Sequence, residues 1–216
     1  MKRICVTGGI ACGKSSVGAF LRASGVNIID ADEVCHALLS QGGPLVEKIV
    51  FAFGEGVLSR DGGINRPALG RIVFYDSEKR LKLNELVHPQ ARQAINLWLK
   101  MQEAGRVQKN RLCARRAGIA AVLVPLVYEA GWEAGWDAIV CVASPLSIQI
   151  ERLARKGFSR KEAAARVAAQ MPLAEKMSKA DYVIFNAGPL SGLRQQTALV
   201  FRSIKEQTEK RHGRKK

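Results

Sequence analysis

The chain has few cysteines and no long hydrophobic run, and both features restrict the cellular compartments in which we expect the protein. No apolar run is long enough to span a bilayer, which argues against a membrane-spanning segment. The chain opens directly into a strand-like run, so we expect no signal peptide. The cysteines are scattered, without a C-x-x-C pair or Cys/His metal spacing, which favours a reducing, cytoplasmic setting over a disulfide or zinc framework. They are Cys5, Cys12, Cys35, Cys113 and Cys141.

Acidic residues are also scarce, since 19 Asp and Glu stand against 34 Lys and Arg, for a formal net charge of +15. Such an excess suits a polyanionic ligand. Two basic clusters contribute to it, but no aromatic residues interleave with them as base-stacking surfaces would need. We therefore interpret both as solvated surface rather than as a nucleic-acid site. One comprises Lys109, Arg111, Arg115 and Arg116, and the other Lys205, Lys210, Arg211, Arg214, Lys215 and Lys216.

Close to its start the chain carries a phosphate-binding pattern. Residues 8–15 read G-x-x-x-x-G-K-S, the P-loop sequence. The apolar run Ile4–Val6 precedes it and apolar residues at helical spacing follow, so the motif lies between a strand and a helix as it requires. The glycines allow backbone N–H groups to turn inward around a phosphate. Lys14 adds a positive charge near the β- and γ-phosphates, and the Ser15 hydroxyl suits Mg²⁺, so we predict a nucleotide site.

A second strand-like run, residues 26–29, leads into two carboxylates, Asp30 and Asp32. Both would lie at the edge where parallel α/β sheets hold their ligands. There Asp32 could take a proton from a hydroxyl or help to position Mg²⁺. Capping of the following helix, by Asp30 or Asp32, explains the same residues equally well.

Residues 42–88 show helical periodicity broken by turns, with no strand signal. We expect a largely helical insertion between the second and third strands. A long helix is predicted from about residue 78 past residue 99, with a break or kink near His88 because Pro89 falls inside it.

Three further apolar runs, at 119–124, 138–142 and 181–185, predict the remaining strands. Many P-loop enzymes hold Mg²⁺ with an Asp at the end of a strand like the first of these, and none is present here. Ser144 and Pro145 predict an N-cap and a first helical residue.

The segment after residue 145 is a helix–turn–helix rich in arginine, and a capping-box pattern at Ser159 and Glu162 opens its second helix. Arg152 and Arg155 are three residues apart and are expected to share a face. Such a segment has the character of a lid that closes over a triphosphate. Ordinary surface charge, with Arg155 paired to Glu151, is the alternative.

Taken together, these segments resemble the dephospho-CoA kinases over nearly the whole chain. The DAD after the second strand, the HP after the long helix and the PL..E after the third strand are specific beyond the P-loop. The matching stretches are TGGIACGKSSV, IIDADEV, DGGINRPAL, LNELVHP, VPLVYEAG, QIERLARKGFSRKEAAARVAAQ and KADYVIFNAG.

The resemblance implies an α/β P-loop kinase fold, with a five-stranded parallel sheet flanked by helices, a helical substrate-binding insertion and a helical lid. In a single domain over residues 1–216, we expect the core at 1–40, 117–145 and 180–209. The insertion is expected at about 41–116, the lid at about 146–179 and a basic tail at 210–216.

The resemblance also implies phosphorylation of the ribose 3′-hydroxyl of dephospho-CoA by ATP with Mg²⁺, the final step of coenzyme A biosynthesis. Asp32 would be the general base, and Lys14, Arg155 and Arg152 would neutralise phosphoryl charge. ATP would contact Gly8, Gly9, Ala11, Cys12, Gly13, Lys14, Ser15, Ser16, Asn186 and Gly188, with Ser15 also on the metal. The acceptor would contact Asp32, Arg66, His88, Pro125 and Leu126. We expect a monomer or weak homo-oligomer acting on these small molecules, with no membrane.

The chain departs from the family pattern at several positions. Leu123 lies where an Asp usually precedes the PL segment, which puts a metal or substrate contact in doubt. Phe185 replaces an acidic residue that often precedes the Asn. Cys12 lies at a helix N-terminus beside Lys14, so we expect a lowered thiol pKa and redox sensitivity, against the alternative of a tolerated small residue.

Two other functions remain compatible with the sequence. One is a P-loop kinase for a nucleoside or nucleotide, which would not need the HP and PL..E segments. The other is a nucleotide-binding module with weakened catalysis, attached to nucleic acid by the basic tail, and Leu123 is the residue that keeps it open.

Overall fold

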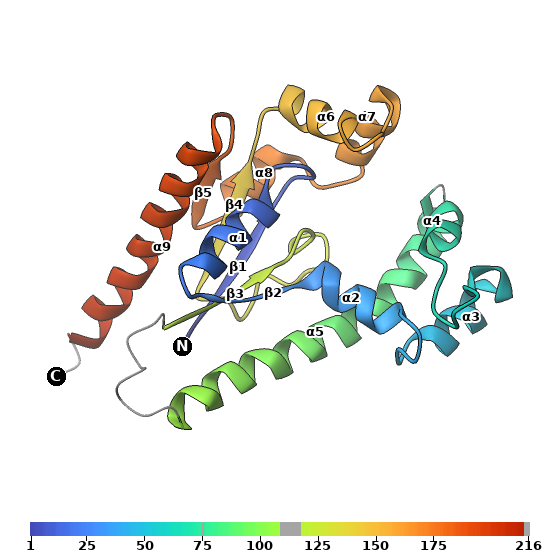
Figure 1. Cartoon of the computed structure of the whole chain (residues 1–216), viewed down its shortest axis with the longest axis horizontal. Coiled ribbons are helices and arrows are strands. Elements are labelled where there is room, and N and C mark those ends of the chain that lie inside the picture. The colour runs from blue at the N-terminus through green and yellow to red at the C-terminus, as the bar shows by residue number, and fades with distance from the viewer. Residues whose placement is uncertain (75, 109–117, 214–216) are drawn as a thin grey trace. The chain divides into compact units, whose positions relative to one another are not determined.

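The computed structural model describes residues 1–74, 76–108 and 118–213 (Figure 1). The strands are β1 (Lys2–Gly8), β2 (Asn27–Asp30), β3 (Ile119–Leu123), β4 (Ala138–Ala143) and β5 (Tyr182–Phe185). The α-helices are α1 (Lys14–Ala23), α2 (Ala31–Leu39), α3 (Val46–Phe53), α4 (Arg66–Phe74), α5 (Ser77–Gln108), α6 (Leu146–Ala154), α7 (Arg160–Ala168), α8 (Leu173–Lys179) and α9 (Leu190–Gly213), with a 3₁₀ turn at Glu55–Val57.

The five strands form one sheet in the order β2-β3-β1-β4-β5. β1 pairs in parallel with β3 and with β4, and β4 pairs in parallel with β5. The register sets Val6 beside Leu123 and Thr7 beside Cys141. The predicted five-stranded parallel sheet is confirmed, and the loop after β1 leaves the sheet at its carboxyl edge, where such folds bind ligands.

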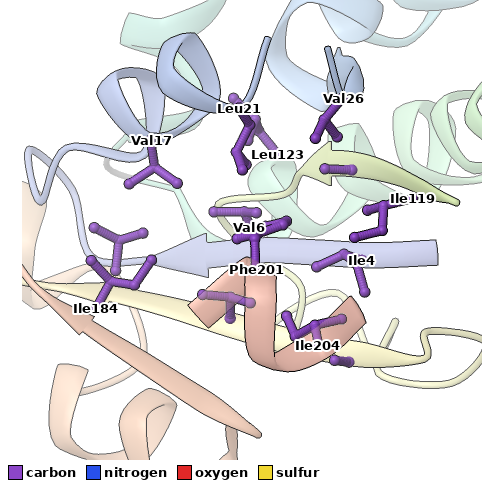
Figure 2. Close-up of a cluster of buried hydrophobic side chains, with 14 of the residues drawn as sticks. Ile4, Val6, Val17, Leu21, Val26, Ile119, Leu123, Ile184, Phe201 and Ile204 are labelled. Atoms are coloured by element: carbon purple, nitrogen blue, oxygen red, sulfur yellow. The ribbon is translucent and has the colours of Figure 1, made fainter. Parts of the chain in front are cut away.

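The main core lies between the sheet and the helices α1 and α9 (Figure 2). Ile4 and Val6 of β1 point into it, and Val17 of α1 and Ile204 of α9 cover them. All four side chains are almost wholly buried. Because β1 is covered on both faces, its apolar run is continuous rather than alternating, as parallel strands require.

The chain divides into two compact units, one of Met1–Ile28 with Gln102–Lys216, and one of Ile29–Met101. The predicted insertion, about 41–116, overlaps the second unit but begins later in the chain. That unit has its own core, in which Leu45, Ile49 and Val57 are buried.

Helix α5 differs from its predicted form. The long helix that we predicted is present and runs unbroken from Ser77 to Gln108 with Pro89 inside it, so the expected break near His88 was wrong, while a kink there stays a prediction. A proline removes one helical hydrogen bond and costs about 3 kcal/mol. A buried stripe at four-residue spacing offsets this cost, and it comprises Val87, Ala91, Ile95 and Leu99.

The helices after β4 match the prediction in part. The capping box at Ser159 and Glu162 is present. Ser144 does not cap α6, since that helix begins at Leu146 with Pro145 at the N-cap. The Ser144 hydroxyl instead donates to the carbonyl oxygen of Asn186, which follows β5. No helix within residues 1–74, 76–108 and 118–213 is long and apolar enough to cross a membrane.

Candidate active site

The P-loop connects β1 to α1, and two of its glycines are required by space and by backbone geometry. Gly8 has φ 138° and Gly13 has φ 102°, conformations that side chains rarely adopt. A Cβ atom on Gly8 would lie 2.0 Å from the Val142 carbonyl oxygen, and one on Gly13 would lie 2.4 Å from Asn186 Nδ2. The loop therefore passes against β4 and Asn186 too closely for any side chain.

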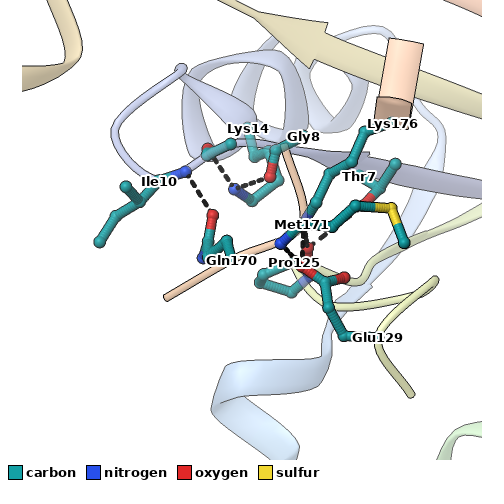
Figure 3. A network of polar contacts seen from close by, with 10 residues as sticks. Thr7, Gly8, Ile10, Lys14, Pro125, Glu129, Gln170, Met171 and Lys176 are labelled. Carbon is teal, nitrogen blue, oxygen red and sulfur yellow. Dashed lines mark hydrogen bonds and ion pairs between the residues drawn. The ribbon is translucent and has the colours of Figure 1, made fainter. Parts of the chain in front are cut away.

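The lysine of the loop, Lys14, is held by the loop's own backbone. Lys14 Nζ donates hydrogen bonds to the carbonyl oxygens of Gly8 and Gly9, at 3.0 Å and 2.9 Å (Figure 3). No acidic residue lies in the first turn of α1, so the positive end of the helix dipole is not neutralised there. Ser15, in that turn, is exposed. A lysine and a helix N-terminus without an acidic residue suit a phosphate chain.

Arg152 of α6 is hydrogen-bonded to the backbone of the P-loop. Its Nη1 donates to the Ala11 carbonyl oxygen at 3.0 Å and to Ser144 Oγ at 3.1 Å. Ala11 is the one non-glycine residue in the described chain with positive φ, at 57°. A charged donor on its carbonyl helps to hold this uncommon conformation. In this structure, Arg152 thus acts on the loop backbone.

Arg155 lies elsewhere. It forms an ion pair with Glu151 one turn back, and its side chain is 75% exposed. This pair is the alternative that we gave for Arg155 from the sequence, and Arg155 is the C-cap residue of α6. An exposed i,i+4 pair contributes at most about 0.5 kcal/mol, so Arg155 is weakly held.

Asn186, expected near adenine, is buried and bonded to the loop. Its Nδ2 donates to the Cys12 carbonyl oxygen at 2.9 Å, and its own carbonyl accepts from Ser144 Oγ at 2.7 Å. Gly188 is exposed, and a Cβ atom there would meet nothing within 4 Å. Asn186 therefore links the end of β5 to the P-loop, whereas Gly188 shows no steric need for glycine.

Cys12 does not have the reactive character that we expected. The residue is completely buried. Burial raises the pKa of the Cys12 thiol above its ordinary value, and the nearby Lys14 charge and hydrogen bonds from Ser144 oppose this only in part. Our prediction of a lowered pKa was wrong, because the side chain points into the core and not toward the phosphate side. The alternative, a tolerated small residue, fits the structure.

The Pro125 segment follows β3 and is tied to neighbouring elements. The Pro125 carbonyl oxygen accepts from Thr7 Oγ1 at 3.3 Å and from Lys176 Nζ at 3.0 Å. Glu129, the last residue of the PL..E stretch, forms an ion pair with Lys176 at 2.6 Å. Leu126 is half-buried. Glu129 therefore stabilises this segment through its ion pair with Lys176, and its carboxylate is not free.

Leu123, where we noted a missing Asp, is a core residue. It is 5% exposed and lies in the cluster beneath α1. A Cβ atom on Gly18 would come within 2.9 Å of Leu123 Cδ1. The leucine therefore fills space that exists because residue 18 is glycine.

In the unit Ile29–Met101, the two aspartates after β2 have separate roles. Asp30 is the N-cap of α2, and its Oδ1 accepts from the Asp32 N–H at 2.9 Å. Asp32 lies in the first turn and is exposed. Since Asp30 caps the helix, the capping explanation does not account for the Asp32 carboxylate.

Arg66 opens α4 in the same unit and contacts α2. Its Nη1 donates to His36 Nδ1 at 2.9 Å. Asp32 and Arg66 also both act electrostatically on Cys35, whose pKa is raised to about 11, chiefly by burial. The structure therefore brings Asp32 and Arg66 to one region of this unit. Sequence reasoning missed His36, although its place one helical turn after Asp32 was a usable signal.

His88 lies in α5 and is half-buried. Burial, assisted by the positive charge of Arg92, lowers the pKa of His88 below its ordinary value. The imidazole is therefore neutral at pH 7 and suits a hydrogen bond rather than an ion pair with phosphate.

Two further residues near the P-loop were not singled out from the sequence. Gln170 Oε1 accepts from the Ile10 N–H of the loop at 2.9 Å (Figure 3). Lys176 is completely buried, with its ammonium on Pro125 and Glu129. Periodicity carries no signal for a buried lysine, because its partners lie far away in the chain.

A P-loop between a central parallel strand and a helix, followed by arginine-bearing helices after the fourth strand, defines the class of P-loop kinases. The family model of dephospho-CoA kinase matches residues 3–191. A dephospho-CoA kinase of Symbiobacterium thermophilum is 43% identical over 206 residues, which are 94% of this chain and 81% of that relative. The chain belongs to the dephospho-CoA kinase family.

Solved structures agree with this assignment. A Thermus thermophilus protein aligns with a TM-score of 0.73 and 34% identity, over 93% of this chain and 97% of that one. The dephospho-CoA kinase of Campylobacter jejuni aligns with a TM-score of 0.64 and 29% identity, over 96% of this chain and all of that one. The similarity therefore extends through both compact units.

Proposed function

We propose that the chain transfers the γ-phosphoryl group of ATP to the ribose 3′-hydroxyl of dephospho-CoA, the final step of coenzyme A biosynthesis, in the cytoplasm. The observation that carries this proposal is the extent of the family match, residues 3–191, which includes the P-loop unit and the unit that bears Asp32 and Arg66. A nucleotide site alone would not indicate the acceptor. We keep the expectation of a monomer or weak homo-oligomer.

On the nucleotide side, the loop amides and Lys14 hold the β- and γ-phosphates, helped by the N-terminus of α1. The bonds from Lys14 to the carbonyl oxygens of Gly8 and Gly9 keep the ammonium over the loop. Arg152 and Asn186 support the backbone of the loop, since they donate to the carbonyl oxygens of Ala11 and Cys12.

On the acceptor side, Asp32 accepts the proton of the 3′-hydroxyl as the phosphoryl group moves. Its exposure and its freedom from capping support this role. Arg66, His88 and the Pro125–Leu126 segment bind the acceptor. Arg66 supplies positive charge for phosphate, whereas the neutral His88 supplies a hydrogen bond.

Helices α6 and α7 act as the lid, and Arg155 is the residue that reaches the transferring phosphoryl group. Its exposed position and weak pair with Glu151 leave it available. Arg152, which is bonded to Ala11 and Ser144, supports the loop instead.

Mg²⁺ would accompany ATP. Within the described ranges, no group of three or more His, Cys, Asp or Glu side chains could hold a metal ion. The site nonetheless fits, because Mg²⁺ takes most of its ligands from phosphates and water and needs one or two from the protein. The exposed Ser15 hydroxyl would supply one, and the ion would neutralise phosphate charge.

A coupled ADP-release assay with Mg-ATP tests the proposal. Dephospho-CoA should support turnover at least about 100-fold faster than nucleosides or no acceptor, since a site built for one acceptor leaves polar groups unpaired with others. Equal release with nucleosides would instead favour a nucleoside kinase. ATP binding without acceptor-dependent release would favour a module with weakened catalysis.

A further inference from the structure

The segment from Gln170 to Lys176, which we call the return segment, follows the candidate lid helix α7 and includes the first residues of α8. It contacts the P-loop at one end, where Gln170 Oε1 accepts from the Ile10 N–H at 2.9 Å. It contacts the segment after β3 at the other, where Lys176 Nζ donates to the Pro125 carbonyl oxygen at 3.0 Å (Figure 3). The return segment thus links the nucleotide loop to the segment expected to meet the acceptor.

Between these ends it is held twice more. The Met171 N–H donates to Glu129 Oε1 at 3.0 Å, and the same oxygen lies 2.6 Å from Lys176 Nζ. Leu173 Cδ1 lies 3.5 Å from the position that a Cβ atom on Gly9 would take. All of these contacts lie within one compact unit.

The ammonium of Lys176 is the unusual component. Its side chain is completely buried, while that of Glu129 is 23% exposed. Burying a charged ammonium is costly, and an apolar side chain of similar volume is often as stable or more stable in such a place. Core stability therefore does not explain a lysine here. What the lysine provides, and an apolar residue cannot, is directed bonds to Pro125 and Glu129 at once.

We propose that Lys176 is a positioning residue of the kinase reaction, which fixes the Pro125 carbonyl and so the place of the Pro125–Leu126 segment against the acceptor. Gln170 positions the nucleotide side from the opposite end of the return segment. The inference rests on the proposed function in one respect, that Pro125–Leu126 meets dephospho-CoA.

The test separates positioning from stability by removing both charges. In the Lys176→Met, Glu129→Gln double variant, no ammonium is buried, and the side-chain amide oxygen introduced at position 129 can still accept from the Met171 N–H. We expect a thermal midpoint close to that of the wild type, a KM for dephospho-CoA raised about tenfold, as the loss of a charged hydrogen bond predicts, and a Kd for a non-hydrolysable ATP analogue within about twofold.

Lys179→Met is the matched control on the same helix, since Lys179 is 45% exposed, pairs with Glu175 and lies over the Tyr128 ring at 5.7 Å from its centroid. It should leave both constants unchanged. Gln170→Leu tests the nucleotide end of the return segment. We expect the Kd for the ATP analogue to rise severalfold and the KM for dephospho-CoA to stay unchanged.

A stable double variant with wild-type KM for dephospho-CoA would overturn the inference, as would equal losses of ATP and acceptor affinity. If the double variant does not fold, Thr7→Val replaces it, because it removes the other donor to Pro125 without changing charge. A raised acceptor KM in that variant supports the inference, and an unchanged one overturns it. Failure of the proposed function is distinguishable, because the wild type would then show no turnover with dephospho-CoA.

Discussion

The P-loop and the region around Asp32 differ in how firmly their residues are held. Loop groups are bonded from three other elements, by Arg152 of α6, Gln170 after α7 and Asn186 after β5. Asp32 and Arg66 are exposed, and Arg66 contacts the equally exposed His36. The nucleotide loop is therefore formed as part of folding, whereas Asp32 and Arg66 lie at the surface, where they can meet a ligand. Substitutions in the loop should change stability and ATP binding together, and substitutions at Asp32 should change turnover alone.

Gly8→Ala should have the largest effect, because its Cβ atom would lie 2.0 Å from the Val142 carbonyl oxygen in a backbone conformation unsuited to alanine. We expect a loss of stability of at least about 3 kcal/mol and no detectable ATP binding. Thermal unfolding and calorimetric titration measure both. Gly192→Ala is the control, since its Cβ atom meets nothing within 4 Å. Normal ATP binding by Gly8→Ala would contradict the conclusion that the P-loop is firmly held and has no room for a side chain at this position.

Asp32→Asn should lower turnover by about 10²- to 10⁴-fold, the usual contribution of a positioned base. The exposed carboxylate has no capping role, so the thermal midpoint and ATP affinity should stay near wild type. Glu33→Gln, an exposed acid in the same helical turn, is the matched control and should retain activity. Steady-state rates and ATP titrations decide, and unchanged turnover would remove Asp32 from the mechanism.

Arg152 and Arg155, at the end of α6, should affect different quantities when they are replaced. Arg155→Met should lower kcat by about 10²-fold with unchanged stability, as the loss of a group that meets developing charge would. Arg152→Met should weaken ATP binding about tenfold and lower stability, because the Ala11 carbonyl loses a charged donor. The split between kcat and Kd in the two variants is the measurement. The reverse pattern would exchange their roles.

Cys12→Ala should have the smallest effect, with ATP affinity within about threefold of wild type after a modest packing loss. A buried thiol with a raised pKa should resist alkylation in the native protein at pH 7–8. Peptide mapping after labelling should show little modification of Cys12, equal with and without ATP. Rapid labelling that ATP suppresses would restore the redox-sensitive interpretation.

Much of the fold could be predicted because it depends on local patterns. Apolar runs indicated all five strands, and the glycine spacing indicated the loop. Pro89 misled because its local cost is offset by a buried stripe that forms only on folding. Cys12 misled because its neighbour Lys14 is visible in sequence, whereas the direction of its side chain is not.

The supporting residues of the site were the least predictable. Arg152, Gln170 and Lys176 act through partners 141, 160 and 51 residues away. Such contacts leave no periodicity, so their residue types alone indicated surface or lid. The roles of Arg66 and His88 stay predictions that came from the family resemblance, and that of Asp32 stays a prediction that its place after the second strand had left open beside capping.

The most direct test of the account is the identity of the product. Wild-type protein with Mg-ATP and dephospho-CoA should form ADP and coenzyme A in equal amounts. Mass spectrometry and ³¹P NMR should locate the new phosphate on the ribose 3′-oxygen. ATP consumption that leaves dephospho-CoA unchanged, or phosphate on another oxygen, would contradict the account.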